Sequence, residues 1–298
     1  MDLSHRVLAR WKTDRHSLPG GKVLIWDLGR SKPHLLLTIP AYHIFSATWS
    51  PDGTQVATSH NDRFVRFWDA DTGELRRTLA VYSESESEAK RKRMQSRISR
   101  LRRKKQVKKI LVETEVDRLI SSGPLAYSKN TWDEVRSVAW SPSGDNFATG
   151  TEDGVQIWEC GSWELKTVFR EQAKLISLAW SPDGRKLAST SYSDQVCIFD
   201  IKESSLQHRL KASYSNALAW SPDGRLIASV LESDIQLWDS STGKLLHVLE
   251  GHTNTPRAVS FSRDGRFLAS GAESDRISNK TSKSRASTIR LWRTDNWT

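Results

Sequence analysis

The chain has 298 residues, with 45 Lys and Arg against 35 Asp and Glu, and a formal net charge of +10 at pH 7. No run of about 18 apolar residues occurs, and the N-terminal residues lack the apolar centre of a signal peptide, which argues against a membrane span and against export. Only Cys160 and Cys197 are present, without metal-binding spacing, so we expect free thiols and a reducing compartment, the cytoplasm or, in a eukaryote, the nucleus.

Three apolar, partly alternating runs open the chain, at residues 6–11, 23–27 and 34–39. Alternation of this kind is typical of β-strands. By comparison with the repeats that follow, these runs are the second, third and fourth strands of a four-stranded repeat whose first strand is missing.

From about residue 45 the same order of strands occurs with its first strand included. The stretch "WSPDG" at 49–53 marks it, because Ser, Pro and Gly occupy the first, second and fourth positions of a type I β-turn. Related stretches stand at 140–144, 180–184, 220–224 and 261–265. Each lies between two short apolar runs, which predicts two strands joined by a tight turn.

A third run, with strict alternation, follows each turn and ends in Trp or Phe, and a fourth run comes after it. Four complete repeats are predicted near 45–80, 135–170, 174–210 and 214–250, and residues 256–292 supply three more strands. The aromatic residues before the turns, from residue 140 onward, are 40 or 41 residues apart. This period, with four antiparallel strands per repeat, is typical of β-propeller blades.

These repeats resemble those of the WD-repeat (WD40) family, whose third strand ends in a Trp-Asp pair. The residues that carry the resemblance are Trp26, Trp68, Trp158, Phe199, Trp238 and Trp292, with Asp69 and Asp239. It covers nearly the whole chain outside 81–134. The resemblance implies an all-β propeller of four complete blades plus two incomplete terminal ones, in which these aromatic residues pack between blades.

The resemblance also implies a buried hydrogen-bond set within a blade, formed by a His before the first strand, a Ser or Thr on the second, a loop Asp and the third-strand Trp. Only the last blade matches it well, through His252, Ser270, Asp275 and Trp292. At the position of His252 the other blades have Pro40, Thr131, Glu171 and Lys211. We expect these blades to depend more on apolar packing.

A charged insertion, residues 81–134, separates segment 1–80 from segment 135–298. It has no Gly or Pro from 83 to 122 and is rich in helix-forming residues, which predicts a helix. Its basic residues are Lys90, Arg91, Lys92, Arg93, Arg97, Arg100, Arg102, Arg103, Lys104, Lys105, Lys108 and Lys109. Such a run would contact nucleic acid or another anionic surface, or would simply be solvated and paired with the preceding glutamates.

The predicted strands leave an unpaired edge at each end of the chain, because the first repeat lacks its first strand and the last repeat lacks its fourth. Natural sheets usually protect such edges. We therefore expect a piece of a longer propeller or an irregularly closed one, and self-association of residues 1–298 through these edges.

No sequence motif for nucleotide binding, metal binding or nucleophilic catalysis occurs, and the eight His are scattered, so we expect neither enzyme activity nor a cofactor. Rigid blades that present many loops predict a scaffold or sensor module, and the resemblance implies proteins or peptides as partners. Two alternatives stay open. One is the repeat tail of a multidomain signalling or effector protein, and the other is a nucleic-acid or ribonucleoprotein-associated propeller that uses the basic run 90–109.

Overall fold

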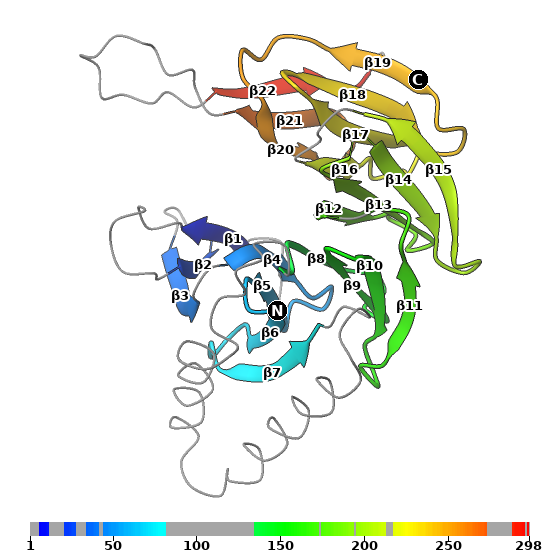
Figure 1. Cartoon of the computed structure of the whole chain (residues 1–298). Helices are drawn as coiled ribbons and strands as arrows, with labels where there is room; N and C mark the ends of the chain where they lie inside the picture. Colours follow the sequence, from blue (N-terminus) through cyan, green and yellow to red (C-terminus); the bar gives the residue numbers. More distant parts are fainter. Residues whose placement is uncertain are drawn as a thin grey trace, which may run out of the picture. The chain divides into compact units, whose positions relative to one another are not determined.

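The computed structural model describes residues 6–11, 21–27, 34–41, 44–81, 134–172, 174–193, 195–212, 217–272, 288–295 and 297. By their contacts, Met1–Ala47 and Ala57–Val135 form a first unit, and Thr48–Val56 and Arg136–Thr298 form a second. Every regular element in the described ranges is a β-strand (Figure 1). The all-β class is therefore confirmed, whereas the predicted helical insertion lies outside the described residues.

The described strands form six antiparallel sheets, four with four strands and two with three, in which strands that follow each other in the chain are neighbours. The first sheet is β1 (Arg6–Trp11), β2 (Gly21–Asp27) and β3 (His34–Ala41). The second is β4 (Ile44–Trp49), β5 (Gln55–His60), β6 (Phe64–Asp69) and β7 (Leu75–Ala80). The antiparallel blades of a propeller are thus confirmed.

The remaining four sheets belong to the second unit. The third is β8 (Ser137–Trp140), β9 (Asn146–Thr151), β10 (Gly154–Glu159) and β11 (Leu165–Phe169). The fourth is β12 (Leu175–Trp180), β13 (Lys186–Ser191), β14 (Gln195–Asp200) and β15 (Ser205–Lys211). The fifth is β16 (Leu218–Trp220), β17 (Leu226–Leu231), β18 (Asp234–Asp239) and β19 (Leu245–Leu249). The sixth is β20 (Pro256–Phe261), β21 (Phe267–Ala272) and β22 (Thr288–Arg293).

The second and third strands of the four-stranded sheets are the most buried elements. In β14, Val196 and Ile198 are fully buried on one face, and Cys197 and Phe199 are fully buried on the other. Both faces are covered because a sheet in the middle of a stack packs against a neighbour on each side. The fourth strands are largely exposed, as the alternating burial of β15 illustrates.

Hydrophobic clusters of the second unit join each sheet to the next. Phe169 of β11 stacks on Phe199 of β14, with ring centroids 4.4 Å apart. The same cluster contains Val155, Leu178 and Trp180. A second cluster joins the fourth sheet to the fifth, and a third joins the fifth to the sixth. Apolar packing between sheets thus forms the core of this unit.

Indole hydrogen bonds also join the first strands of neighbouring sheets. Trp180 Nε1 donates to the carbonyl oxygen of Ala139 at 3.1 Å, and Trp220 Nε1 donates to that of Ala179 at 2.9 Å. Phe261 stands at the corresponding position of β20, where its ring has no N–H to donate. These bonds position successive sheets, and therefore the turns at their ends.

Candidate binding face

Ser-Pro-Asp-Gly turns, or the variants Ser-Pro-Ser-Gly and Ser-Arg-Asp-Gly, join the first and second strands of the second to sixth sheets and are fixed by both side chain and backbone. In the turn 181–184, Ser181 Oγ donates to Asp183 Oδ1 at 2.6 Å and accepts the backbone N–H of Lys186 at 2.9 Å. Gly184 N–H donates to Ser181 O at 2.9 Å. The φ of Gly184 is +70°, in the left-handed region that favours glycine.

The same side-chain bond occurs in three further turns. Ser50, Ser221 and Ser262 each donate Oγ–H to the Asp two residues later, at 2.6, 2.5 and 2.6 Å. The remaining turn has Ser143 in place of the Asp, and its Oγ lies 3.3 Å from Ser141 Oγ. Four turns therefore hold a carboxylate in one common geometry.

Proline of one turn contacts glycine of the next. A Cβ on Gly184 would lie 3.6 Å from Pro142 Cδ, and one on Gly224 would lie 3.6 Å from Pro182 Cδ. The other pairs are Gly144 with Pro51 and Gly265 with Pro222. The five turns of the second unit thus touch one after another, and we call residues 50–53, 141–144, 181–184, 221–224 and 262–265 the turn row.

Hydrogen bonds keep the carboxylates of the turn row ionised. The hydroxyl of Ser262, then the backbone N–H of Arg266, lower the pKa of Asp264 to about 2. Burial raises the pKa of Asp183 and Asp223, but hydrogen bonds from the Ser and the backbone of each turn more than offset it, so both pKa values lie below the usual range. The row is therefore acidic at neutral pH.

We expect the second unit to lose thermal stability as the pH falls from about 4 towards 2. The pKa of Asp264 is about 2 in the fold and 3.8 without it. Its stabilising contribution is therefore complete above pH 4 and is lost as the pH falls through the folded value. Melting temperatures measured across this range should decline less steeply in Asp264→Asn than in the wild type. Equal slopes would contradict the assignment.

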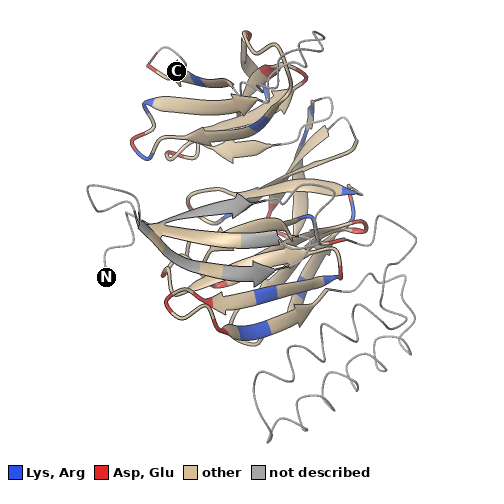
Figure 2. Cartoon of the chain, turned by 90° about the vertical axis from the view of Figure 1, so that its left-hand side faces the viewer, with Lys and Arg blue, Asp and Glu red and all other residues tan. Residues whose placement is uncertain are grey.

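Exposed charge pairs follow the turns. The side chains of Arg185 and Asp183 are 83% and 59% exposed, with Nε and Oδ2 4.0 Å apart. Those of Arg266 and Asp264 are 75% and 46% exposed, with Nε and Oδ2 2.6 Å apart. Exposed ion pairs of this kind contribute little to stability. Their charged side chains can therefore form ion pairs with a partner at little cost to the fold. Figure 2 shows that the described acidic residues lie mainly at turns and strand ends.

A hollow of about 380 Å³ opens between two neighbouring turns of the turn row. Asp183, Asp223, Lys186 and Trp220 are among the residues that line it. Lys186 Nζ donates to Ser240 O at 3.3 Å. Side chains of both charges and one aromatic side chain therefore line this hollow.

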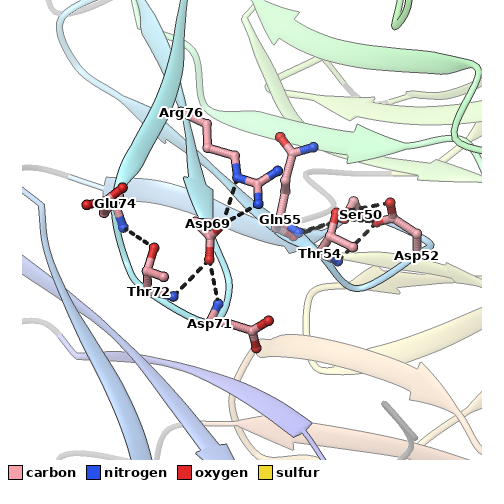
Figure 3. Close-up of polar contacts among 9 residues, drawn as sticks. All are labelled: Ser50, Asp52, Thr54, Gln55, Asp69, Asp71, Thr72, Glu74 and Arg76. Atoms are coloured by element: carbon pink, nitrogen blue, oxygen red, sulfur yellow. Dashed lines mark hydrogen bonds and ion pairs between the residues drawn. The ribbon is translucent and has the colours of Figure 1, made fainter. Parts of the chain in front are cut away.

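The Asp of the Trp-Asp pair fixes the turn between the third and fourth strands. Asp69 Oδ1 accepts the backbone N–H groups of Asp71 and Thr72 at 2.9 and 2.8 Å (Figure 3). Arg76 Nε donates to Asp69 Oδ2 at 2.8 Å. The N–H of Thr72 and the Arg76 guanidinium hold the pKa of Asp69 well below its usual range. Asp239 accepts the corresponding backbone N–H groups in the fifth sheet.

The hydrogen-bond set expected in the sixth sheet is centred on Ser270. His252 Nε2 lies 2.6 Å from Ser270 Oγ, and Trp292 Nε1 donates to the same oxygen at 2.9 Å. Burial, and then the charge of Arg290, lower the pKa of His252, so its ring is neutral at pH 7. Asp275 lies outside the described residues.

Three other sheets keep the bond between the third-strand Trp and a hydroxyl group on the second strand. The pairs are Trp68 with Thr58 at 2.8 Å, Trp158 with Thr149 at 3.0 Å and Trp238 with Ser229 at 2.9 Å. In the second sheet His60 Nε2 lies 2.8 Å from Thr58 Oγ1. This imidazole reaches the hydroxyl from the second strand itself, a position that sequence analysis missed.

In the fourth sheet Phe199 stands in place of the Trp, and the second-strand hydroxyl, that of Ser189, has a different partner. Ser189 Oγ donates to Gln172 Oε1, and Gln172 Nε2 donates to Gln195 O at 2.8 Å. The spacing from His252 to Phe261 in the sixth sheet, applied to Trp180, leads to Glu171. Gln172 takes this place instead, because the segment before Trp180 is one residue shorter than the segment before Phe261. Gln172 directly follows Glu171 and has a side-chain amide that can bind a hydroxyl, so the sequence did contain a signal for this residue.

The family described as "WD domain, G-beta repeat" matches residues 34–69, 126–159, 163–200, 204–239 and 243–293. The chain belongs to the WD40 repeat family. Each matched range ends one residue after a third-strand Trp or Phe, the position at which the Trp-Asp pair was recognised. The resemblance drawn from the sequence is therefore confirmed.

Several curated proteins are similar to this WD40 chain. U3 small nucleolar RNA-associated protein 4 homolog of Homo sapiens is 30% identical over 156 residues, 47% of this chain and 22% of that protein. WD repeat-containing protein WDS homolog of Arabidopsis thaliana is 24% identical over 267 residues, 85% and 42% of the two chains. Pre-mRNA-processing factor 19 of Oryza sativa subsp. japonica is 27% identical over 150 residues, 47% and 28%. The WD40 chain thus spans less than half the length of these relatives.

Both cysteines of the WD40 chain are free thiols. Burial raises the pKa of Cys197 to about 12, and burial with nearby carboxylates raises that of Cys160 to about 12. Because the thiolate is the reactive form, we expect slow alkylation by iodoacetamide at about pH 8 in the folded protein and fast alkylation after denaturation. Mass spectrometry measures both rates. Equal rates at Cys197 before and after denaturation would refute this.

Other sequence expectations concern charge, metal and membrane. The basic run 90–109, predicted to contact polyanions, lies outside the described residues. In the ranges that the structure describes, no three His, Cys, Asp or Glu side chains are grouped so that they could hold a metal ion. Those ranges also contain no helix with the length and apolar character needed to cross a membrane.

Proposed function

We propose that this WD40 chain is a non-catalytic scaffold that binds proteins or peptides through the turn row. The observation that carries the proposal is the repeated Ser–Asp hydrogen bond, 2.5 to 2.6 Å long in four turns. A surface whose side chains are held in place before binding loses less conformational entropy when a partner binds.

The charge pattern of the turn row suggests how a partner would be recognised. Three turns present an Asp followed two residues later by an Arg. These pairs are Asp183 with Arg185, Asp223 with Arg225 and Asp264 with Arg266. A partner with alternating charges would match this spacing, and such complementarity favours specificity and fast association.

The scaffold proposal is tested by reversing the exposed basic charge that directly follows three turns of the turn row. The test variant combines Arg185→Glu, Arg225→Glu and Arg266→Glu, and the matched control, with the same charge change elsewhere, combines Lys166→Glu, Arg170→Glu and Lys211→Glu. All six side chains are exposed, so we expect little change in melting temperature.

Affinity capture with quantitative mass spectrometry compares the wild type with both variants. We expect proteins that the wild type retains to be lost from the turn-row variant and kept by the control. Equal retention by both variants would exclude the turn row as the contact surface. A wild type that retains nothing specific would overturn the scaffold function itself.

A ribonucleoprotein-associated scaffold is the second candidate. Two relatives carry names that refer to a small nucleolar RNA and to pre-mRNA processing. The basic run 90–109 has twelve Lys or Arg and no acid, and its binding to a polyanion would depend strongly on salt. The free thiols fit a reducing compartment, the nucleus or the cytoplasm. Deletion of residues 83–110 should reduce RNA retention at about 0.1 M salt, and unchanged retention would exclude this role.

A further inference from the structure

A second turn lies beside each turn of the turn row in the third to sixth sheets. The first and third strands of these antiparallel sheets run in the same direction, so the turns that follow them stand at the same edge. A backbone N–H of the second turn donates to the carbonyl oxygen of the residue after the first turn, at 2.9 to 3.1 Å: Cys160 to Asp145, Ile201 to Arg185, Ser240 to Arg225 and Thr294 to Arg266. The two turns of each sheet therefore form one surface.

We call this surface the charged edge, and it includes four of the five turns of the turn row. It comprises residues 141–146 and 159–164 of the third sheet, 181–186 and 200–205 of the fourth, 221–226 and 239–244 of the fifth, and 262–267 and 293–295 of the sixth. All of these residues belong to the second unit.

The charged edge is acidic at the third sheet and basic at the sixth. In the third sheet it has three carboxylates and no basic residue, and we call these carboxylates the acidic end: Asp145, Glu159 and Glu164. In the sixth sheet it has two aspartates and three arginines, and we call the arginines the basic end: Arg263, Arg266 and Arg293. The fourth sheet has three charges of each sign and the fifth has two of each, so the edge is neutral between its ends.

The charged side chains of both ends are available to a partner. All six are exposed, and they stand at turns rather than on the sheet faces, where neighbouring sheets pack. Arg293 Nη2 lies 2.8 Å from Asp295 Oδ2, and both side chains are exposed, so this pair contributes little to stability. After burial, the charges of Asp145 and Glu159 raise the pKa of the Cys160 thiol, which shows that these two carboxylates act on one small region.

We propose that the charged edge binds the same edge of a second copy of this chain. A two-fold axis that passes between the fourth and fifth sheets places the third sheet of each copy opposite the sixth sheet of the other. The acidic end then faces the basic end at both ends of the interface, in one closed arrangement. The alternative alignment brings like charges together and is disfavoured.

A second copy fits this surface because a two-fold interface must be self-complementary, and one edge here carries both members of each charge match. The inference rests on the proposed function, since the turn row supplies much of the contact surface. It also gives the alternating charges of that row a particular partner.

Sedimentation velocity of the whole chain measures the self-association. We expect a monomer–dimer equilibrium at about 0.05 M salt that shifts towards the monomer at about 0.5 M, because salt screens exposed charges. A chain that stays monomeric up to about 0.1 mM at the lower salt, or that forms oligomers larger than a dimer, would overturn the proposal.

Two variants each reverse one end of the charged edge. The acidic-end variant combines Asp145→Lys and Glu164→Lys, and the basic-end variant combines Arg263→Glu and Arg266→Glu. Each variant places like charges opposite each other in the dimer and should weaken dimerisation at least about tenfold. A chain with all four substitutions has the charges of its two ends exchanged, so it should dimerise as the wild type does. If it stays monomeric, the proposal is wrong.

The matched control combines Arg170→Glu and Lys211→Glu, which change the net charge as the basic-end variant does. Both residues are exposed and lie at the far ends of β11 and β15, at the other edge of their sheets. The control should dimerise normally. Dimerisation that neither end variant weakens would place the interface elsewhere on the chain.

The failure of this inference differs from the failure of the scaffold function. A monomeric wild type that still captures proteins, which the Arg185→Glu, Arg225→Glu, Arg266→Glu variant then loses, would overturn the second copy as partner and leave the scaffold function standing. A wild type that dimerises through its two ends but captures no other protein would do the reverse.

Discussion

Gly154→Ala is expected to destabilise the second unit by about 3 kcal/mol or more, because it combines a disfavoured backbone conformation with a backbone clash. Gly154 has a φ of +130°, and a Cβ added to it would lie 2.0 Å from the carbonyl oxygen of Phe169. That oxygen belongs to the main chain of β11, where Phe169 pairs with Val155. Relief of the clash would therefore require β10 and β11 to separate at this end.

Urea or thermal unfolding, followed by circular dichroism, measures the loss. Gly161→Ala is the matched control, because a Cβ there would have no atom within 4 Å and the φ of Gly161 is not among the positive values. We expect the control to unfold close to the wild type. Similar unfolding curves for the two variants would show that the connection from β9 to β10 does not need this conformation.

Phe199→Ala is expected to cost about 3 to 5 kcal/mol, the usual range for the loss of a fully buried aromatic ring. Phe199 has no exposed surface, and it stacks on Phe169 of the preceding sheet at 4.4 Å. Its loss would leave a cavity in the cluster that joins the third and fourth sheets. The junction between the two sheets, as well as the fold of one of them, should therefore weaken.

The comparison variant for this change is Phe267→Ala. Phe267 is 36% exposed on β21, so removal of its ring should cost only about 1 to 2 kcal/mol. Chemical denaturation gives both free energies of unfolding. A smaller loss for Phe199→Ala than for Phe267→Ala would mean that the packing between the third and fourth sheets contributes little to stability.

The blades could be predicted from the sequence because each of their features is local. A turn such as Ser181 to Gly184 needs only its own residues, and alternation around Trp238 needs only one strand. The contacts between turns could not be predicted in the same way. Pro182 meets Gly224 only because neighbouring sheets stack with their turns side by side.

The polar contacts of the blades were only partly predictable. His252 matched a known pattern at its expected position, and the structure places it at Ser270. His60 and Gln172 reach their hydroxyl groups from positions that no fixed spacing indicates. A difference of one residue in a connecting loop decides which side chain reaches the second-strand hydroxyl. The spacing of residues in the sequence does not determine the path of that loop.

The indole hydrogen bonds between first strands have a consequence for the order of unfolding. Each sheet of the second unit contacts its neighbours in sequence, and Trp180 and Trp220 each bind the preceding sheet through a carbonyl group. Between sheets that contact each other in sequence, the junction with the fewest interactions opens first. Phe261 cannot form this bond, so β20–β22 should detach before the other sheets, and a protease that cuts the partly unfolded chain should first cleave the connection after Leu249.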